Sequence, residues 1–172
     1  MKLDDDDFTL FGMPQRFAID RAELDDHWRA IQAQVHPDRF ASQGTAAQRV
    51  AMQWAVRVNE AYRRLKDPLS RGAYLCELRG ASVDAENNTA MPAAFLMQQM
   101  EWREALDDAG QPDAVQALDT AVAAHEKSQI ALLQHQFDDL GDAVAAAQTV
   151  RALMFVAKFR HDIDRRLETL EP

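Results

Sequence analysis

The chain has 172 residues, of which 47% are apolar, enough for one domain or two small ones with packed cores. Its single cysteine excludes an internal disulfide and a zinc site built from paired cysteines. No apolar run approaches the roughly 20 residues that a membrane-spanning helix needs. The acidic start lacks the basic and apolar pattern of a signal peptide, so we expect a cytoplasmic protein that acts at no membrane.

The net charge of −9 is distributed unevenly. Residues 1–75 contain 11 basic and 11 acidic residues, whereas residues 76–172 contain 8 basic and 17 acidic ones. This split predicts two domains with different partners, and it argues against nucleic-acid binding by the second half. We interpret the run Asp4–Asp7 as a solvated tail, because a calcium loop would need a glycine and a distal glutamate.

The first half predicts a helical hairpin. Phe8–Pro14 is typical of a short apolar helical turn, and Asp20 is a candidate N-cap with Glu23 three residues later. Four apolar residues then follow at helical spacing, namely Leu24, Trp28, Ile31 and Val35. Pro37 prevents this helix from continuing.

A second apolar stripe follows after a ten-residue loop that contains Ser42 and Gly44. Its members are Val50, Trp54, Val58, Ala61 and Leu65, and the stripe ends at Asp67-Pro68. Because neither helix can bury its stripe alone, we expect the two to pack antiparallel. A shorter helix over about residues 70–78 should close this unit, with Cys76 as a small buried apolar residue.

The second half predicts a three-helix bundle. Residues 80–91 show no periodicity and carry Asn87-Asn88-Thr89, which indicates a linker. Helical stretches then cover about residues 92–108, 112–140 and 142–170, separated by breaks at Gly110 and Gly141. We therefore expect an all-α fold with a domain at 1–79, a linker at 80–91 and a bundle at 92–172. Phe95 is assigned to the core, and Trp102 is expected to be partly exposed.

The tripeptide His36-Pro37-Asp38 is the most informative motif. It lies at the tip of the predicted hairpin, where Pro37 fixes the loop and lets His36 and Asp38 project in a defined way. A motif of only three residues occurs by chance in many proteins, so its interpretation depends on the helices that flank it. Arg29 precedes the motif and Arg39 follows it, and the second helix ends in the segment Asn59–Pro68.

In this context the motif resembles the J-domain of DnaJ-type co-chaperones. The resemblance implies that His36, Pro37 and Asp38 bind a DnaK-class chaperone and stimulate its ATP hydrolysis. It also implies, more loosely, that Arg29 and Arg39 meet an acidic surface of that chaperone. The chain departs from the pattern in three ways within this region. The first helix is sparsely basic and contains Asp25, Asp26 and His27. Val35 stands where many J-domains have an aromatic residue, and Arg39 replaces a commoner lysine.

Four segments in the right order resemble the HscB branch more specifically. They are Phe8–Pro14, His36–Phe40, Pro68–Leu75 and Phe95–Glu104. This resemblance implies a co-chaperone of iron–sulfur cluster assembly that delivers the scaffold protein IscU to the chaperone HscA. It implies no enzymatic activity, no cofactor and no bound metal of its own.

In the HscB family the scaffold-binding surface lies on the first and last helices of the bundle. The residues here at the matching positions are Leu96, Met97, Met100, Glu101, Glu104, Asp108 and Phe155. Leu96, Met100 and Glu104 follow at i, i+4 and i+8, which makes an apolar strip edged by carboxylates. For Leu96 and Met97 the alternative is burial in the bundle.

The last helix has a predicted core stripe at Val150, Leu153, Val156, Ala157, Ile163, Leu167 and Leu170. Phe155 lies about 130° around the helix from the centre of this stripe, so we expect it to be exposed, with burial as the alternative.

Two other functions compete with the co-chaperone hypothesis. In a small hydrolase His36 would act as a base oriented by Asp38, but the chain has no nucleophile elbow or phosphate-binding glycine loop. A structural helical adaptor would not need the tripeptide at all. We expect a monomer, which is the default state of an asymmetric adaptor.

Overall fold

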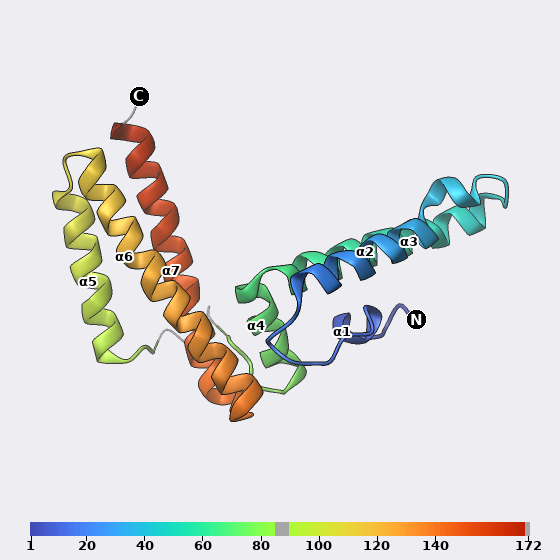
Figure 1. The fold of residues 1–172 in the computed structure, drawn as a ribbon, viewed down its shortest axis with the longest axis horizontal. Coiled ribbons are helices and arrows are strands. Elements are labelled where there is room, and N and C mark those ends of the chain that lie inside the picture. Colours follow the sequence, from blue (N-terminus) through green and yellow to red (C-terminus); the bar gives the residue numbers. More distant parts are fainter. Residues whose placement is uncertain (85–89, 171–172) are drawn as a thin grey trace. The chain divides into compact units, whose positions relative to one another are not determined.

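Every regular element that the structure, a computed structural model, describes in residues 1–84 and 90–170 is helical, which confirms the predicted all-α fold (Figure 1). The chain forms two compact units, Met1–Leu75 and Cys76–Pro172. The predicted linker residues Asn87-Asn88-Thr89 lie outside the described residues. In the described part of the chain, no helix has both the length and the apolar character needed to cross a bilayer.

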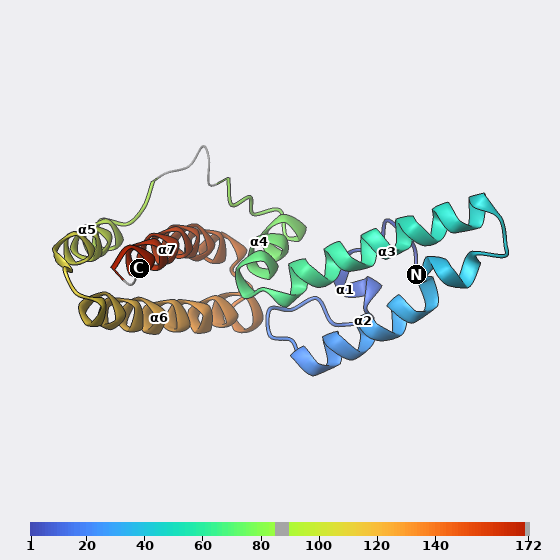
Figure 2. The same cartoon turned by 90° about the horizontal axis from the view of Figure 1, so that it is seen from above.

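The first unit is built on an antiparallel hairpin of α2 (Arg21–Val35) and α3 (Thr45–Lys66) (Figure 2). Asp20 caps α2 as expected, since its carboxylate accepts hydrogen bonds from the amides of Ala22 and Glu23. The core of the hairpin is apolar, and its fully buried residues are Leu24, Val58, Ala61 and Leu65. Burial of these residues stabilises two helices that would be marginal alone.

The expectation of a solvated acidic tail is wrong. Asp6 caps the short helix α1 (Asp7–Leu10) by accepting from the amides of Phe8 and Thr9. Asp7 is fully buried, which the run of four identical residues does not indicate. The segment is therefore an ordered part of the first unit.

Two arginines of α3 compensate the buried charge of Asp7. Arg57 Nη1 lies 2.7 Å from Oδ1 of Asp7, and Arg64 Nη1 lies 3.2 Å from Oδ2. The Asp7 amide donates a hydrogen bond to the hydroxyl of Tyr74, 3.0 Å away. Arg57 also donates to the backbone carbonyls of Leu3 and Asp5, so one side chain holds the N-terminal segment at several points.

Helix α4 (Pro68–Leu78) completes this part of the chain, and the unit boundary falls within it. Asp67 starts it by accepting from the amide and hydroxyl of Ser70. Cys76 is buried as expected, and burial raises the pKa of its thiol to about 11. The thiol is therefore protonated and unreactive at neutral pH.

The second unit contains a three-helix bundle of α5 (Ala93–Asp108), α6 (Pro112–Gln134) and α7 (Ala143–Leu170), as the sequence predicts. Helix α6 ends in a single π turn, η2 (His135–Asp139), which the sequence does not indicate. The side chains at its two ends are hydrogen-bonded, with His135 Nδ1 2.7 Å from Asp139 Oδ2. The segment before α5 contacts α7, because the buried Arg151 donates to the carbonyl of Val83.

The bundle core corrects one expectation about α5. Trp102 is buried: its ring stacks on Phe159 at 5.9 Å between centroids and meets the ring of His125 edge-on at 5.0 Å. The other buried residues of this cluster come from all three helices and the α5–α6 turn, namely Leu106, Ala109, Val115, Val122, Val156, Phe159 and Ile163. Phe95 packs against this cluster, as assigned, although it is only partly buried.

Asp7→Asn is expected to lower the free energy of unfolding of the first unit by roughly 2–4 kcal/mol, because it leaves two arginines without their buried carboxylate. Urea titration followed by circular dichroism measures the change. Asp4→Asn is the matched control, since Asp4 is exposed and should change stability by less than about 0.5 kcal/mol. Equal stability of the Asp7 variant and the wild type would contradict the proposed role of this ion-pair cluster.

The bundle is expected to lose stability as the pH falls below 6.5. Burial lowers the pKa of His125 below its ordinary value of 6.5, and its Nε2 is buried without a hydrogen-bond partner. The unfolded chain therefore binds a proton at this side chain before the folded chain does, so acid favours unfolding. Urea melts of the wild type between pH 7.5 and 5.5 should show this slope, and His125→Leu should flatten it. An unchanged slope in the variant would exclude His125 as the cause.

Candidate functional site

The tripeptide forms an exposed turn at the tip of the α2–α3 hairpin. Helix α2 ends at Val35, and Pro37 is the first residue of a 3₁₀ turn, η1 (Pro37–Phe40), inside the stretch expected to be an irregular loop. The missing amide hydrogen and fixed φ of proline suit that first position. His36 caps the turn, because its Nδ1 accepts a hydrogen bond from the Asp38 amide at 3.3 Å.

In this arrangement Nε2 of His36 and the carboxylate of Asp38 remain accessible to another molecule. His36 and Asp38 are exposed, and His36 Nδ1 lies 3.6 Å from Oδ2 of Asp38. With Nδ1 acting as acceptor, the neutral imidazole carries its proton on Nε2, which can donate to another molecule. The Asp38 carboxylate is available to accept hydrogen bonds or to pair with a cation. The turn thus presents one donor and one acceptor in a fixed relation.

Arg39 helps to hold this turn against the end of α2. Its Nη1 donates to the carbonyl of Ala33 at 2.8 Å. That carbonyl belongs to the last turn of α2, where backbone acceptors lack helical partners. Arg39 was predicted as a chaperone contact, and in the structure its guanidinium hydrogen-bonds the end of α2.

Nearby acidic residues compensate both arginines of α2. Arg29 pairs with Asp26 at 3.0 Å, and Arg21 pairs with Asp25 at 2.7 Å. Hydrogen bonds from Arg21 and from the hydroxyl of Tyr62 lower the pKa of the Asp25 carboxyl, so it stays charged. All these groups lie near the surface, where solvent screens the attraction. With two arginines against Glu23, Asp25 and Asp26, this helix offers a partner no net positive charge.

The geometry offers little support for hydrolysis or metal chemistry. The imidazole and carboxylate of His36 and Asp38 are open to water, whereas a catalytic base pair works best in a shielded pocket. Among the described residues, no three His, Cys, Asp or Glu side chains gather where they could hold a metal ion. The turn is better suited to recognition than to catalysis.

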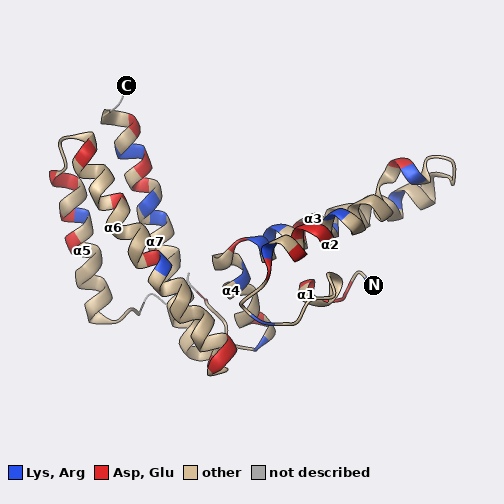
Figure 3. Cartoon of the chain, in the orientation of Figure 1, with Lys and Arg blue, Asp and Glu red and all other residues tan. Residues whose placement is uncertain are grey.

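The second predicted surface lies on the solvent face of α5. Leu96, Met97 and Met100 are 45%, 63% and 71% exposed, so the alternative of burial for the first two is wrong. Three carboxylates on the same helix are also exposed, namely Glu101, Glu104 and Asp108. In Figure 3 the acidic residues of α5 follow its first, uncharged turns. An apolar patch next to negative charge is therefore present.

Phe155 lies on α7 next to α5 and is half-buried, between the two alternatives considered from the sequence. Its ring lies 6.5 Å from that of Phe95, tilted by 59°. It lines a hollow of about 40 Å³ together with Gln99 and Arg103 of α5. The structure thus brings Phe155 to the helix that carries Leu96. Gln99 and Arg103 were not predicted, although their spacing of 3 and 7 residues from Leu96 places them on one side of the helix.

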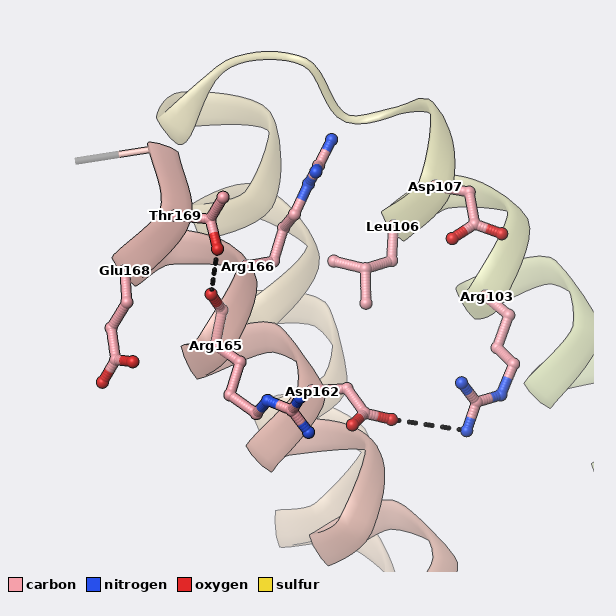
Figure 4. Close-up of a pocket in the computed structure, with 8 residues that line it drawn as sticks. All are labelled: Arg103, Leu106, Asp107, Asp162, Arg165, Arg166, Glu168 and Thr169. Atoms are coloured by element: carbon pink, nitrogen blue, oxygen red, sulfur yellow. Dashed lines mark hydrogen bonds and ion pairs between the residues drawn. The ribbon is translucent and has the colours of Figure 1, made fainter. Parts of the chain in front are cut away.

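A polar cleft of about 620 Å³ between α5 and α7 was also missed (Figure 4). Arg103 pairs with Asp162 across it at 3.4 Å, and Thr169 donates to the carbonyl of Arg165. Three arginines and three carboxylates line the cleft, so it has no charge excess that would select a small ion. Its lining residues are Arg103, Leu106, Asp107, Asp162, Arg165, Arg166, Glu168 and Thr169.

Comparisons with known proteins agree with the geometry of both units. Residues 91–164 match a family model described as the HSCB C-terminal oligomerisation domain. A co-chaperone protein HscB homolog from Burkholderia multivorans is 50% identical over 173 residues, and the match covers 99% of each chain.

Two solved structures share the fold. Chaperone HscB from Vibrio cholerae matches with a TM-score of 0.82 and 36% identity, over 96% of this chain and 99% of that one. Human co-chaperone protein HscB matches with a TM-score of 0.91 and 26% identity, over 96% of this chain and 84% of that one. The chain therefore belongs to the HscB family of co-chaperones.

Proposed function

We propose that this co-chaperone stimulates the ATPase of a DnaK-class chaperone, HscA, through His36, Pro37 and Asp38. The observation that carries the proposal is the exposed, capped turn in which these three residues are held at the tip of the hairpin. We also propose that the bundle binds the iron–sulfur scaffold protein IscU and delivers it to the chaperone for cluster assembly. Membership of the HscB family supports both parts.

The turn would act by presenting groups in a rigid arrangement. The His36 cap and the contact of Arg39 with Ala33 limit the conformations of the loop before the chaperone arrives. Less conformational entropy is then lost on binding. The chaperone would recognise the Nε2 proton of His36 and the carboxylate of Asp38 together, because it must match both their charge and their spacing. Arg29, paired with Asp26, would contribute to the rim of the contact.

The α5 surface would recognise a partner by apolar contact and charge. Leu96, Met97 and Met100 supply exposed apolar area, and flexible methionine side chains adapt to an irregular partner surface. The carboxylates of Glu101, Glu104 and Asp108 would favour a basic rim on the scaffold. Phe155 extends this surface onto α7. A cytoplasmic location, a monomeric state and the lack of a cofactor, of nucleic-acid binding and of enzymatic activity remain predictions from the sequence.

His36→Gln is expected to abolish stimulation of chaperone ATP turnover, because glutamine cannot cap the turn and present a donor with imidazole geometry. The measurement is single-turnover ATP hydrolysis by a DnaK-class chaperone with increasing amounts of this protein. His161→Gln is the matched control, since His161 is an exposed histidine on α7 and should leave stimulation unchanged.

Three results would argue against this proposal. Stimulation by the His36 variant equal to the wild type would make the tripeptide dispensable, as the adaptor hypothesis requires. ATP turnover by this protein alone would favour an enzyme. Equal loss in the His36 and His161 variants would point to a general defect.

The combined variant Leu96→Ala, Met100→Ala, Phe155→Ala is expected to weaken binding of the scaffold by about 10- to 100-fold, because it removes the apolar centre of the surface. Calorimetric titration with purified IscU measures the affinity, and far-ultraviolet circular dichroism checks that the bundle stays helical.

A control with Leu132→Ala and Leu140→Ala removes two exposed leucines outside the predicted surface and should bind normally. Undiminished affinity of the triple variant would exclude this surface. Collapse of helicity would assign these three side chains to folding and refute their role as contacts.

A further inference from the structure

The apolar stripe of α3 is longer than α2 can cover. Helix α3 has 22 residues and α2 has 15, a difference of about 10 Å in length at the helical rise. Val50 belongs to the predicted stripe, yet it is 52% exposed, whereas Val58 and Leu65 further along the stripe are fully buried. The N-terminal part of α3 thus presents apolar residues that α2 leaves uncovered.

These residues line a groove at the tip of the hairpin with a volume of about 550 Å³, which is large enough for several side chains. Seven of its nine lining residues are apolar and two are glutamines, so it carries no formal charge. They come from the end of α2, from η1 and its following turn, and from α3: Gln34, Val35, Phe40, Gln43, Ala46, Ala47, Val50, Ala51 and Trp54.

The groove is continuous with the tripeptide turn. Val35 lies directly before His36, and Phe40 is the last residue of η1. The residues that flank the tripeptide on both sides therefore line the groove, so a molecule bound to His36 and Asp38 lies near it. Val35 forms part of the floor, and a larger side chain at this position would fill some of the space.

We infer that this groove receives an apolar segment of the same chaperone that binds the tripeptide, an inference that rests on the proposed function. Because the groove adjoins the turn, the molecule that binds the turn is the one best placed to fill the groove. Its uncharged lining indicates that the segment contributes apolar side chains. The two contacts then have different roles. The groove provides affinity through buried apolar area, whereas His36 and Asp38 cause the acceleration of ATP hydrolysis.

Val50→Asp tests this division, because it places a carboxylate in the apolar groove at an exposed position where folding should tolerate it. The concentration of co-chaperone that gives half-maximal ATPase stimulation should rise by at least about tenfold, while the maximal stimulation is retained. Val50→Leu should stay within about twofold of the wild type. Val56→Asp is the matched control, since Val56 is 57% exposed on the same helix and does not line the groove.

The outcomes separate this inference from the proposed function. If the wild type gives no stimulation, the proposed function fails and the inference fails with it. If the wild type stimulates and Val50→Asp has the same half-saturation point, the inference alone is overturned. Equal weakening by Val56→Asp, or loss of maximal stimulation in Val50→Asp, also overturns it. Self-association of the wild type that Val50→Asp abolishes would assign the groove to a second copy of the chain.

Discussion

The end of α2 is the constraint on which the candidate chaperone contact depends. Pro37 cannot donate the amide hydrogen that another helical turn would need, so the helix stops and the chain turns. The imidazole of His36 then caps the new turn, and Arg39 reaches back to a carbonyl of the helix that has just ended. Each of these contacts satisfies a backbone group that the interruption would leave unpaired. The same break that ends the helix therefore makes the loop rigid.

The two units bury their apolar residues in different ways. In the first unit the α2–α3 hairpin is completed by buried residues from outside it, among them Phe8, Phe17 and Leu75, and a buried carboxylate between two arginines holds the short N-terminal helix. In the bundle three long helices enclose a larger core with a stacked Trp102 and Phe159. Both arrangements leave an apolar area uncovered, on α5 in the bundle and beside the tripeptide in the hairpin. Such areas commonly mark sites where other molecules bind.

Most helix boundaries followed from local signals in the sequence. Asp20 and Pro112 mark helix starts, and the observed helices begin within one residue of each. The helix expected from about residue 70 begins two residues earlier, at Pro68. The 3₁₀ conformation of Pro37–Phe40 and the π turn after α6 were missed. Pro37 predicts where α2 ends but not the conformation that follows, and the π turn has no cap or proline to mark it. The burial of Asp7 was also missed, since its partners lie 50 and 57 residues further along the chain.

The sequence predicted only part of the candidate site, because local signals reveal some of its residues and contacts with distant segments determine the others. The exposure of the tripeptide and of α5 follows from helical periodicity and a proline, which are local. Phe155 could not be assigned from its own helix, because its environment depends on α5, more than 50 residues earlier. Val50 shows the opposite case: its spacing predicts burial, but burial also requires a partner helix that reaches it. Clefts and grooves that form between helices cannot be predicted from the residue pattern of a single helix.

The thiol of Cys76 has a practical consequence for labelling experiments on this protein. It is the only cysteine in the chain, and burial keeps it protonated and shielded from reagents. A cysteine introduced at a surface position in each unit would therefore react with a maleimide dye while the native thiol stays silent. The wild-type background thus suits fluorescence energy transfer without prior removal of a native residue from the core.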